Sequence, residues 1–273
     1  MPELPEVETT KRGIAPFVLH QTLLDIVVRQ PKLRLPVPNN MHQLIVGKSI
    51  IDVTRRGKYI LLHLSEGTLL IHLGMSGHLR LVPINTPHEK HDHIDLVLAN
   101  DKVLRYTDPR RFGLFIYIQG NPLLHPLLTH LGPEPLTHAF NAEYLISRAQ
   151  GKSQCIKSFI MTNQVVVGVG NIYAAESLFL ARVHPQMAAG AVTKRRLTQL
   201  TSTIKDVLQQ AIHAGGTTLR DFYSFDGKPG YFSIQLKVYG RQNLPCYVCE
   251  SVIEAITIGG RKSAFCPQCQ ALS

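Results

Sequence analysis

Four of the five cysteines lie near the end of the chain, and their spacing limits what this region can form. Cys246 and Cys249 make one Cys-x2-Cys pair, and Cys266 and Cys269 make a second. Two such pairs can direct four thiolates to one tetrahedral centre, so the pattern predicts one structural Zn²⁺ with no open coordination position. Two disulfides or a redox pair are the alternative, but no thioredoxin-like βαβ pattern surrounds the motif.

The segment between the two cysteine pairs reads as two short strands joined at glycines. Gly259 and Gly260 lie at the join, and Arg261 and Lys262 follow them. A hairpin of this kind would present Arg261 to a phosphate. Simple solvation of the two charges in the turn is the other interpretation.

The charge of the chain favours a polyanionic partner. The net charge is +10, with 15 Lys+Arg against 12 Asp+Glu in residues 1–140 (+3) and 14 against 7 in residues 141–273 (+7). Neutralising phosphates is what Lys and Arg do on DNA, so the second part is expected to be the main phosphate-binding side. A merely soluble basic surface is the alternative.

The length of 273 residues suggests roughly two domains. No apolar stretch approaches the ~18 residues of a spanning helix, and the acidic start Met1-Pro-Glu-Leu-Pro-Glu lacks the pattern of a signal peptide. We therefore expect a protein of the cytoplasm, associated with the nucleoid.

Periodicity predicts one leading helix followed by β-structure. The helix is expected from Pro5 to about Leu19. Short β-rich runs separated by turn signals then predict an antiparallel sandwich. These runs are Asp25–Val28, Tyr59–Leu64, Leu69–Leu73, His78–Val82, Ile94–Leu98, Val103–Tyr106 and Leu114–Ile118.

After about His130 the pattern becomes helical. The predicted helices are Ala142–Gln150, Ile156–Asn163, Ile172–Val183 and Lys194–Ala214. Residues 223–231 are rich in glycine and proline and predict a loop. From about Val238 the cysteine-bounded hairpin begins.

Several segments together carry a family resemblance. They are Pro2-Glu-Leu-Pro-Glu-Val-Glu, His72-Leu-Gly-Met-Ser-Gly, Tyr106-Thr-Asp-Pro-Arg-Arg-Phe-Gly, Val167-Gly-Val-Gly-Asn-Ile-Tyr, Gly227-Lys-Pro-Gly-Tyr and the four-cysteine tail. Because these segments occur together and in this order, the chain resembles formamidopyrimidine-DNA glycosylase from end to end. The resemblance implies an α+β fold: an N-terminal helix with an antiparallel β-sandwich (1–130), a helix-two-turns-helix domain (131–235) and a C-terminal zinc-finger β-hairpin (236–273).

Two positions depart from the family pattern. Arg182 stands in Ala181-Arg-Val-His-Pro, where relatives commonly have glycine, and Glu250 follows Cys249, where glycine is also frequent. Glycine suits a left-handed helix end, so the departure at Arg182 raises the question of how the local turn is formed.

An amine can break a base–sugar bond by attacking C1′ and holding the sugar as an iminium, whose charge acidifies the C2′ proton. At neutral pH lysine (pKa ~10.4) is nearly all protonated, whereas an α-amino group (pKa ~8) is substantially free. By resemblance, the nucleophile is Pro2. This requires removal of Met1, because an acylated proline nitrogen is an amide; an ordinary Met-Pro start is the alternative.

The resemblance assigns further catalytic roles to Glu3, Lys58 and Arg261. Glu3 would be the general acid or base that protonates the opening sugar ring, unless it only complements the helix dipole. Lys58 would contact lesion and phosphate, unless it is a solvated strand-end lysine. Glu6 would be a supporting carboxylate.

DNA-binding roles are expected for His91, Arg110, Lys157 and Asn171. Asn171 opens a predicted helix, where free N–H groups suit a phosphate, and an N-cap role can coexist with this. His91 and His93 resemble metal ligands but lack a second cluster, so a structural or hydrogen-bonding role is favoured. Cys155 is expected to pack in the helical domain.

Excision requires that the target base leave the stack, and inserted side chains must fill the hole. Met75, Arg110 and Phe112 match the void-filling triad of the family, although Met75 and Phe112 could also be core residues. The loop from Thr217 to Tyr231 resembles the segment that covers the extruded lesion.

The resemblance therefore implies a monomeric base excision repair enzyme acting on double-stranded DNA. It would remove oxidised purines such as 8-oxoguanine and formamidopyrimidines opposite cytosine and cleave the strand by β,δ-elimination. One alternative is an endonuclease VIII-like preference for oxidised pyrimidines, against which the triad argues. The other is a zinc-stabilised DNA-binding protein without catalysis.

Overall fold

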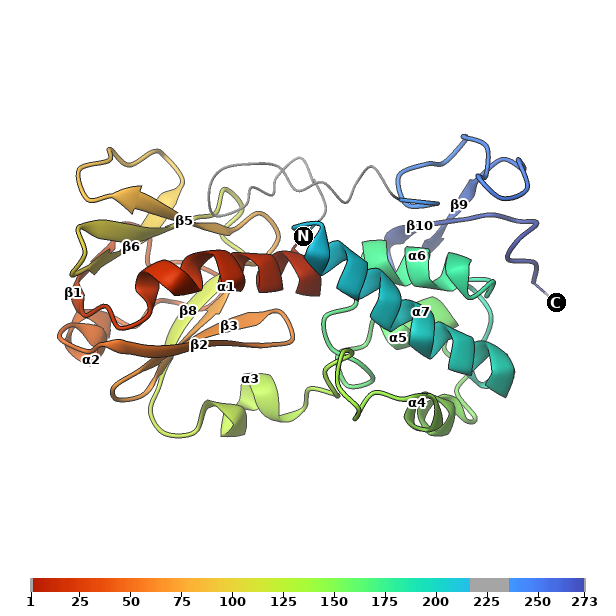
Figure 1. The fold of residues 1–273 in the computed structure, drawn as a ribbon, viewed down its shortest axis with the longest axis horizontal. Helices are drawn as coiled ribbons and strands as arrows, with labels where there is room; N and C mark the ends of the chain where they lie inside the picture. The colour runs from red at the N-terminus through yellow and green to blue at the C-terminus, as the bar shows by residue number, and fades with distance from the viewer. Residues whose placement is uncertain (1, 217–235, 273) are drawn as a thin grey trace. The chain divides into compact units, whose positions relative to one another are not determined.

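The computed structural model describes residues 2–216 and 236–272 (Figure 1). Contacts divide the chain into two compact units, residues 1–129 with 214–231 and residues 130–213 with 232–273, and each is described by itself. Met1 and the predicted loop over 217–231 lie outside the described residues. Among the described helices, none is long and apolar enough to cross a membrane.

The first unit is a sandwich of two antiparallel four-stranded sheets preceded by a helix. One sheet has the strand order β1-β6-β7-β5 and the other β2-β3-β4-β8. Its elements are α1 (Leu4–Val18), β1 (Leu23–Val28), α2 (Met41–Ile45), β2 (Ile50–Arg56), β3 (Tyr59–Leu64), β4 (Thr68–His72), β5 (His78–Pro83), β6 (Asp92–Leu98), β7 (Lys102–Thr107), β8 (Leu114–Ile118), η1 (Pro122–Leu124) and α3 (Pro126–Thr129).

The leading helix and the seven predicted strands are confirmed. The elements α2, β2 and α3 were not predicted from the sequence. The strand β2 has the sequence IIDVTRR, in which only Ile50 and Val53 are buried, so alternation is too weak to reveal it. Helix α1 packs against β2 and β5, one strand from each sheet, and buries Val7, Ile14 and Val18 in the sandwich core.

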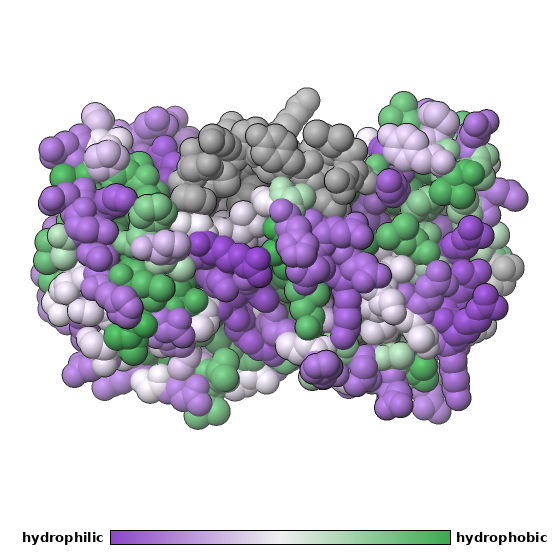
Figure 2. Space-filling model, in the orientation of Figure 1, coloured by the Kyte–Doolittle hydropathy of each residue, from purple (hydrophilic) through white to green (hydrophobic). Residues whose placement is uncertain are grey.

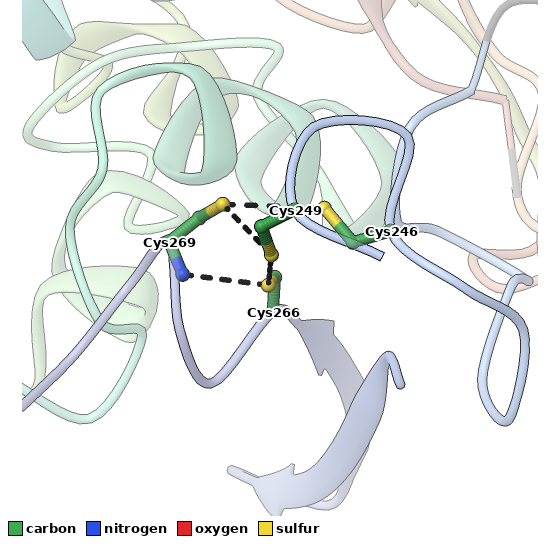
Figure 3. Close-up of side chains that lie close together, drawn as sticks. All are labelled: Cys246, Cys249, Cys266 and Cys269. Atoms are coloured by element: carbon green, nitrogen blue, oxygen red, sulfur yellow. Dashed lines mark hydrogen bonds between the residues drawn. The ribbon is translucent and has the colours of Figure 1, made fainter. Parts of the chain in front are cut away.

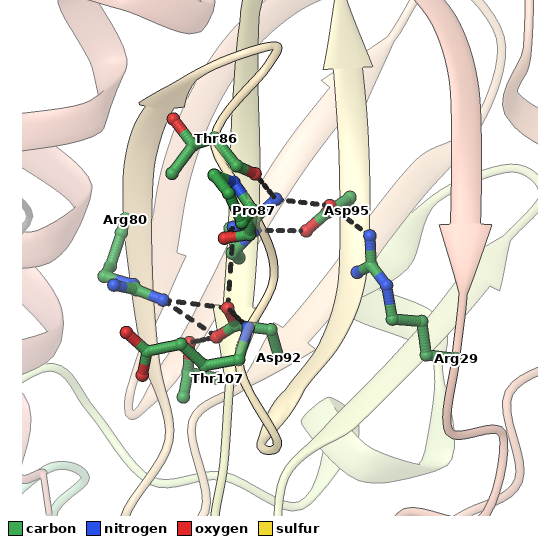
Figure 4. A network of polar contacts seen from close by, with 9 residues as sticks. Arg29, Arg80, Thr86, Pro87, Asp92, Asp95 and Thr107 are labelled. Atoms are coloured by element: carbon green, nitrogen blue, oxygen red, sulfur yellow. Dashed lines mark hydrogen bonds and ion pairs between the residues drawn. The ribbon is translucent and has the colours of Figure 1, made fainter.

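A network of ion pairs covers β6 and β7 on the side away from this core (Figure 4). Arg105 is buried and binds Asp95 with two nitrogens at 2.8 and 2.9 Å. It also donates to the carbonyls of Thr86 and Pro87, in the β5–β6 loop, and to Asp92 at 3.5 Å. Burial alone would raise the pKa of Asp95, but the hydrogen bonds from Arg105 and Arg29 outweigh it and lower that pKa. The network therefore fixes the loop before β6.

The second unit contains helices and the cysteine hairpin. Its elements are α4 (Ala142–Ala149), α5 (Ile156–Ile160), α6 (Asn171–Leu180), η2 (Ala189–Ala191), α7 (Lys194–His213), β9 (Glu254–Ile258) and β10 (Arg261–Phe265). Two predicted helices were too long: α5 ends at Ile160 rather than Asn163, and α6 ends at Leu180 rather than Val183. The α+β fold class is confirmed.

The hairpin packs on α6 through a small core. Ala175 and Phe179 of α6 contact Val238, Ile253 and the buried cysteines of the tail.

On the face shown in Figure 2, hydrophilic residues cover much of the described surface and hydrophobic residues form separate patches.

Candidate functional site

The chain start is held at the first turn of α1. Pro2 and Glu3 are buried, and the backbone N–H of Glu3 donates to Oε2 of Glu6 at 2.8 Å. Glu6 is fully buried and lies against Gly216, where an added Cβ would come within 3.4 Å of its side chain. The structure thus brings the predicted residues Pro2, Glu3 and Glu6 together in one turn.

Lys58 lies in the turn between β2 and β3, and an ion pair fixes this turn to α1. Arg55 donates from Nε to Glu8 at 2.9 Å and from Nη1 to the carbonyl of Gly57 at 2.8 Å. Burial alone would raise the pKa of Glu8, but hydrogen bonds from Lys11, Arg55 and Arg12 lower it to about 2. Glu8 is therefore charged at neutral pH and holds the Lys58 turn beside the helix.

His72 is a site residue that belongs to one of the family motifs but has no role predicted from the sequence. It ends β4 opposite Tyr59, with ring centroids 4.9 Å apart, and its Nδ1 accepts the N–H of Gly74 at 3.0 Å. Desolvation and the positive charges of Lys58 and Arg34 lower the pKa of His72 to about 3. The ring is thus neutral, with its proton on Nε2.

Asp108 is a second residue that received no role from sequence alone. Its buried carboxylate accepts hydrogen bonds from the hydroxyls of Ser76 (2.7 Å) and Tyr106 (2.8 Å) and from the N–H groups of Arg110 (3.2 Å) and Gly113 (2.9 Å). Burial and the Asp108 charge raise the pKa of Tyr106, so its hydroxyl stays a donor. Asp108 joins two turns, one after β4 and one after β7.

These two turns carry the predicted triad. Met75 is 36% exposed and Phe112 is 44% exposed, while the Arg110 guanidinium lies 5.0 Å from the centre of the Phe112 ring. The turns touch at Gly74, where a Cβ would come within 2.5 Å of the backbone of Phe112. The core interpretation of Met75 and Phe112 is therefore wrong.

The histidines before and in β6 are oriented toward the same turn. The carbonyl of His91 accepts the N–H of Asp108 at 3.0 Å, and Nε2 of His93 bonds the carbonyl of Asp108 at 2.8 Å. Within the described residues, the only group suited to a metal is the four cysteines. The ring of His93 therefore has a hydrogen-bonding role, whereas His91 takes part in this contact through its backbone carbonyl.

In the second unit, Lys157, Asn171 and the hairpin form one hydrogen-bonded group. The buried Lys157 ammonium donates to Oδ1 of Asn171 and to Oγ of Ser263, both at 2.6 Å. Asn171 donates from Nδ2 to the carbonyl of Lys262 at 3.1 Å. Because Gly170 is the N-cap and Asn171 is the first helical residue, the N-cap interpretation of Asn171 is wrong.

Arg261 begins β10 directly after the hairpin turn. Gly259 and Gly260 both have positive φ (55° and 71°), as a tight two-residue hairpin requires. Arg261 is exposed, and its carbonyl accepts the Ser263 hydroxyl at 3.2 Å. A cavity of about 190 Å³ opens beside Asn171 and Lys262.

Glu176 of α6 holds the backbone of residues 237–239, shortly before the cysteine hairpin. Its buried carboxylate accepts three backbone N–H groups, from Lys237 (2.8 Å), Val238 (3.0 Å) and Tyr239 (2.8 Å). Burial raises the pKa of Glu176 in spite of these bonds. This anchor determines where the segment leading to the zinc hairpin is attached to α6.

The four tail cysteines point toward one another (Figure 3). Their sulfurs lie within 4.8 Å of each other, with Cys249 to Cys266 at 3.4 Å and Cys246 to Cys269 at 4.0 Å. Four thiolates at a Zn–S distance of about 2.3 Å are about 3.8 Å apart, so the site fits one tetrahedral Zn²⁺. None of the four forms a disulfide, so the disulfide alternative is wrong, and their clustering together with the match to a zinc-finger family model confirms the zinc prediction.

Comparisons with known proteins cover the whole chain. Three family models match: the formamidopyrimidine-DNA glycosylase N-terminal domain (residues 1–115), its H2TH domain (131–223) and a zinc finger found in FPG and IleRS (243–272). A curated formamidopyrimidine-DNA glycosylase from Legionella pneumophila is 62% identical over 100% of this chain and 99% of its own.

Two solved structures of Lactococcus lactis Fpg are similar throughout. A complex of a variant with DNA containing Fapy-dG has a TM-score of 0.93 and 32% identity and covers 99% of this chain and 100% of that one. A complex with DNA containing an abasic site has a TM-score of 0.92 and 33% identity and covers 98% and 99%.

Proposed function

This chain belongs to the formamidopyrimidine-DNA glycosylase family, whose members act on damaged DNA bases, and we propose that it excises oxidised purines from duplex DNA and then cleaves the strand. The substrates would be 8-oxoguanine and formamidopyrimidines opposite cytosine. The observation that supports this most is the turn that holds Pro2, Glu3 and Glu6 together at the start of α1.

Pro2 is the proposed nucleophile. With Met1 removed, its ring nitrogen is a secondary amine that can attack C1′, release the base and form an iminium. That iminium is positively charged without a proton, so it withdraws electrons at any pH. Glu3 is buried beside it and would protonate the ring oxygen of the sugar as it opens, while Glu6 orders the turn through the N–H of Glu3.

Strand cleavage would follow by β,δ-elimination. The iminium acidifies the C2′ proton, whose loss expels the 3′ phosphate, and a second elimination expels the 5′ phosphate. Lys58, Arg261 and Asn171 are the proposed partners of lesion and phosphates, and His91 and Arg110 are proposed DNA contacts. Lys157 is proposed to act through Asn171 and Ser263, since its ammonium donates to both.

Base flipping would be supported by Met75, Arg110 and Phe112. These side chains are exposed on two turns fixed by Asp108, as residues that enter a duplex must be. The role proposed for residues 217–231 in covering the lesion lies outside the described residues. We further propose that the enzyme is a monomer that works where the DNA lies, in the cytoplasm on the nucleoid.

Covalent trapping tests the chemistry. Borohydride should reduce the iminium and link the protein to DNA containing 8-oxoguanine, and the linkage should map to Pro2. Pro2→Gly should lose trapping while it still binds an abasic analogue. A linkage at another residue would refute the mechanism, and intact mass establishes whether Pro2 is the first residue.

A comparison of substrates tests the specificity. Excision of 8-oxoguanine opposite cytosine should exceed that of thymine glycol, and the reverse order would favour the endonuclease VIII-like alternative. Binding to the abasic analogue without turnover of any lesion would favour a non-catalytic DNA-binding protein.

A further inference from the structure

The turn that follows α6 holds an arginine in a conformation that favours glycine. Arg182 has φ of 52°, which is unfavourable for residues with a Cβ. Its side chain is exposed, and its guanidinium has no hydrogen-bond or ion-pair partner within the described residues. The backbone N–H of Arg182 donates to the carbonyl of Phe179 at 3.0 Å, but a strained residue whose charged side chain has no partner among the described residues suggests a role toward a ligand.

A cavity of about 370 Å³ lies beside this arginine, wholly within the second unit. Its polar lining consists of Arg182, Arg196, Thr193, Gln268 and the zinc ligand Cys269, and its apolar lining includes Val183 and Met187. No acidic residue is among the described residues that line it. Arg182 and Arg196 therefore supply positive charge that can hold an anion of a few atoms, while the thiolate charge of Cys269 would be shared with the zinc ion.

The walls of this cavity are fixed by internal hydrogen bonds. Nη1 of Arg196 donates to the carbonyl of Ala181 at 3.0 Å, which leaves the rest of the guanidinium for a ligand. Gln270 donates to the carbonyl of Val183 at 2.9 Å and accepts the N–H of Cys266 at 3.0 Å. The second zinc knuckle is thereby tied to the Arg182 turn, so the site is formed before anything binds.

We propose that this cavity binds a phosphate group between Arg182 and Arg196. One guanidinium is enough to bind both oxygens of a carboxylate through two parallel hydrogen bonds. Two guanidinium groups from separate segments can bind several oxygens of a tetrahedral anion, so the pair favours a phosphate over a carboxylate. The Thr193 hydroxyl accepts the N–H of Arg196, so its own hydrogen is available to the ligand. The phosphate is carried either by a small ester in solution or by a nucleic-acid backbone.

This site is separate from the one proposed around Asn171. Asn171 begins the ten-residue helix α6 and Arg182 follows its end, which places them about 15 Å apart along the helix. Gln268 belongs to the knuckle at the base of the hairpin, whereas Arg261 lies at its turn.

Titration with inorganic phosphate tests the site in the zinc-loaded full chain. By NMR, the amide signals of residues 181–183 should shift saturably. Arg182→Gly keeps the backbone conformation, so it should fold, and it should weaken phosphate binding about tenfold or more. Arg195→Ala is the matched control, because Arg195 is exposed nearby but does not line the cavity, and its affinity should equal that of the wild type.

A second measurement distinguishes the two carriers. The measured quantity is the slope of log affinity against log salt concentration for binding a long lesion-free duplex. If the phosphate belongs to DNA, Arg182→Gly should reduce the magnitude of this slope by about 0.9. An unchanged slope with weakened phosphate binding would assign the site to a small phosphate ester. The proposal is overturned if neither the phosphate affinity nor the slope depends on Arg182.

Discussion

The carboxylate of Asp108 accepts the hydroxyl of Ser76 at 2.7 Å, and this bond joins the two turns that carry the exposed triad. Ser76 directly follows Met75, and the same carboxylate accepts the N–H of Gly113, directly after Phe112. The positions of both exposed side chains therefore depend on one buried charge.

Asp108→Asn should weaken binding to an abasic-analogue duplex about tenfold or more, because an amide cannot accept from donors on every side. Unfolding should become easier by about 2–3 kcal/mol, and by about 1 kcal/mol in Ser76→Ala. Urea unfolding measures the change in stability, and equilibrium binding to the abasic-analogue duplex measures the change in DNA affinity. Asp101→Asn, at an exposed turn, is the control and should change neither. Normal DNA affinity of Asp108→Asn would exclude the positioning role.

Replacement of Glu8 by glutamine should make the free energy of unfolding depend less on pH between pH 4.5 and 2. The pKa of Glu8 is about 2 in the folded chain against an ordinary 4.5, so its stabilisation is present above pH 4.5 and lost as the pH falls toward 2. Allowing for solvent screening, Glu8→Gln should cost about 1–2 kcal/mol at pH 7 and almost nothing near pH 2. Urea unfolding at several pH values measures this. A difference that stays constant with pH would contradict the ion-pair explanation.

His72 should remain neutral well below the ordinary histidine pKa. Because its pKa is about 3 when folded and 6.5 ordinarily, its contribution to stability is complete above pH 6.5 and declines as the pH falls to 3. Nitrogen NMR should show the Nε2–H tautomer down to about pH 4.5. Arg34→Gln should raise this pKa, since Arg34 is one of its causes. A midpoint near 6.5 would show that the ring is not desolvated.

Much of the fold could be predicted from the sequence because its signals are local. Short β-rich apolar runs bounded by turn signals revealed strands such as β3, and cysteine spacing revealed the metal site. The failures have tertiary causes. The predicted helix was extended to Val183 because Ala181 and Val183 continue the apolar pattern, but Arg182 adopts a left-handed conformation and α6 ends at Leu180.

The same limit applies to the candidate site. Residues recognised by motif, such as Pro2 and the cysteines, could be named from sequence. Asp108 and His72 could not be given a role, because that role consists of contacts with residues far away in the chain or with a neighbouring strand. The bond from the buried Lys157 ammonium to Ser263 likewise joins residues 106 positions apart in the sequence.

Glu250→Gly should stabilise the first zinc knuckle. Glu250 has φ of 64°, so the turn keeps the left-handed conformation despite lacking glycine, and the side chain bears the strain. Glycine relieves a cost of roughly 1–2 kcal/mol but gains freedom when unfolded, so a net gain of about 0.5–1 kcal/mol is expected. Thermal unfolding measures it, with Glu250→Ala as control. Equal stability of the two variants would mean that backbone strain is negligible.

Lys157→Met should show whether Lys157 acts directly on DNA or through its neighbours. The ammonium is buried and donates to Asn171 and Ser263, and the Ser263 hydroxyl in turn donates to the carbonyl of Arg261. Its loss should release the Asn171 side chain and weaken DNA binding about tenfold. If Lys157 only positions its neighbours, the salt slope should hardly change, whereas a direct phosphate contact would lower it by about 0.9.

A double-mutant cycle separates positioning by Lys157 from general damage. If Lys157 acts through Asn171, the Lys157→Met and Asn171→Ala effects on affinity should overlap, so that the double variant binds DNA little more weakly than Asn171→Ala. Zinc content should stay at one ion per chain, and Lys194→Met, which removes an exposed lysine of the same unit, should leave the coupling unaffected. Additive losses would show that Lys157 does not act through Asn171, which leaves direct DNA contact or positioning through Ser263, and the salt slope distinguishes these two.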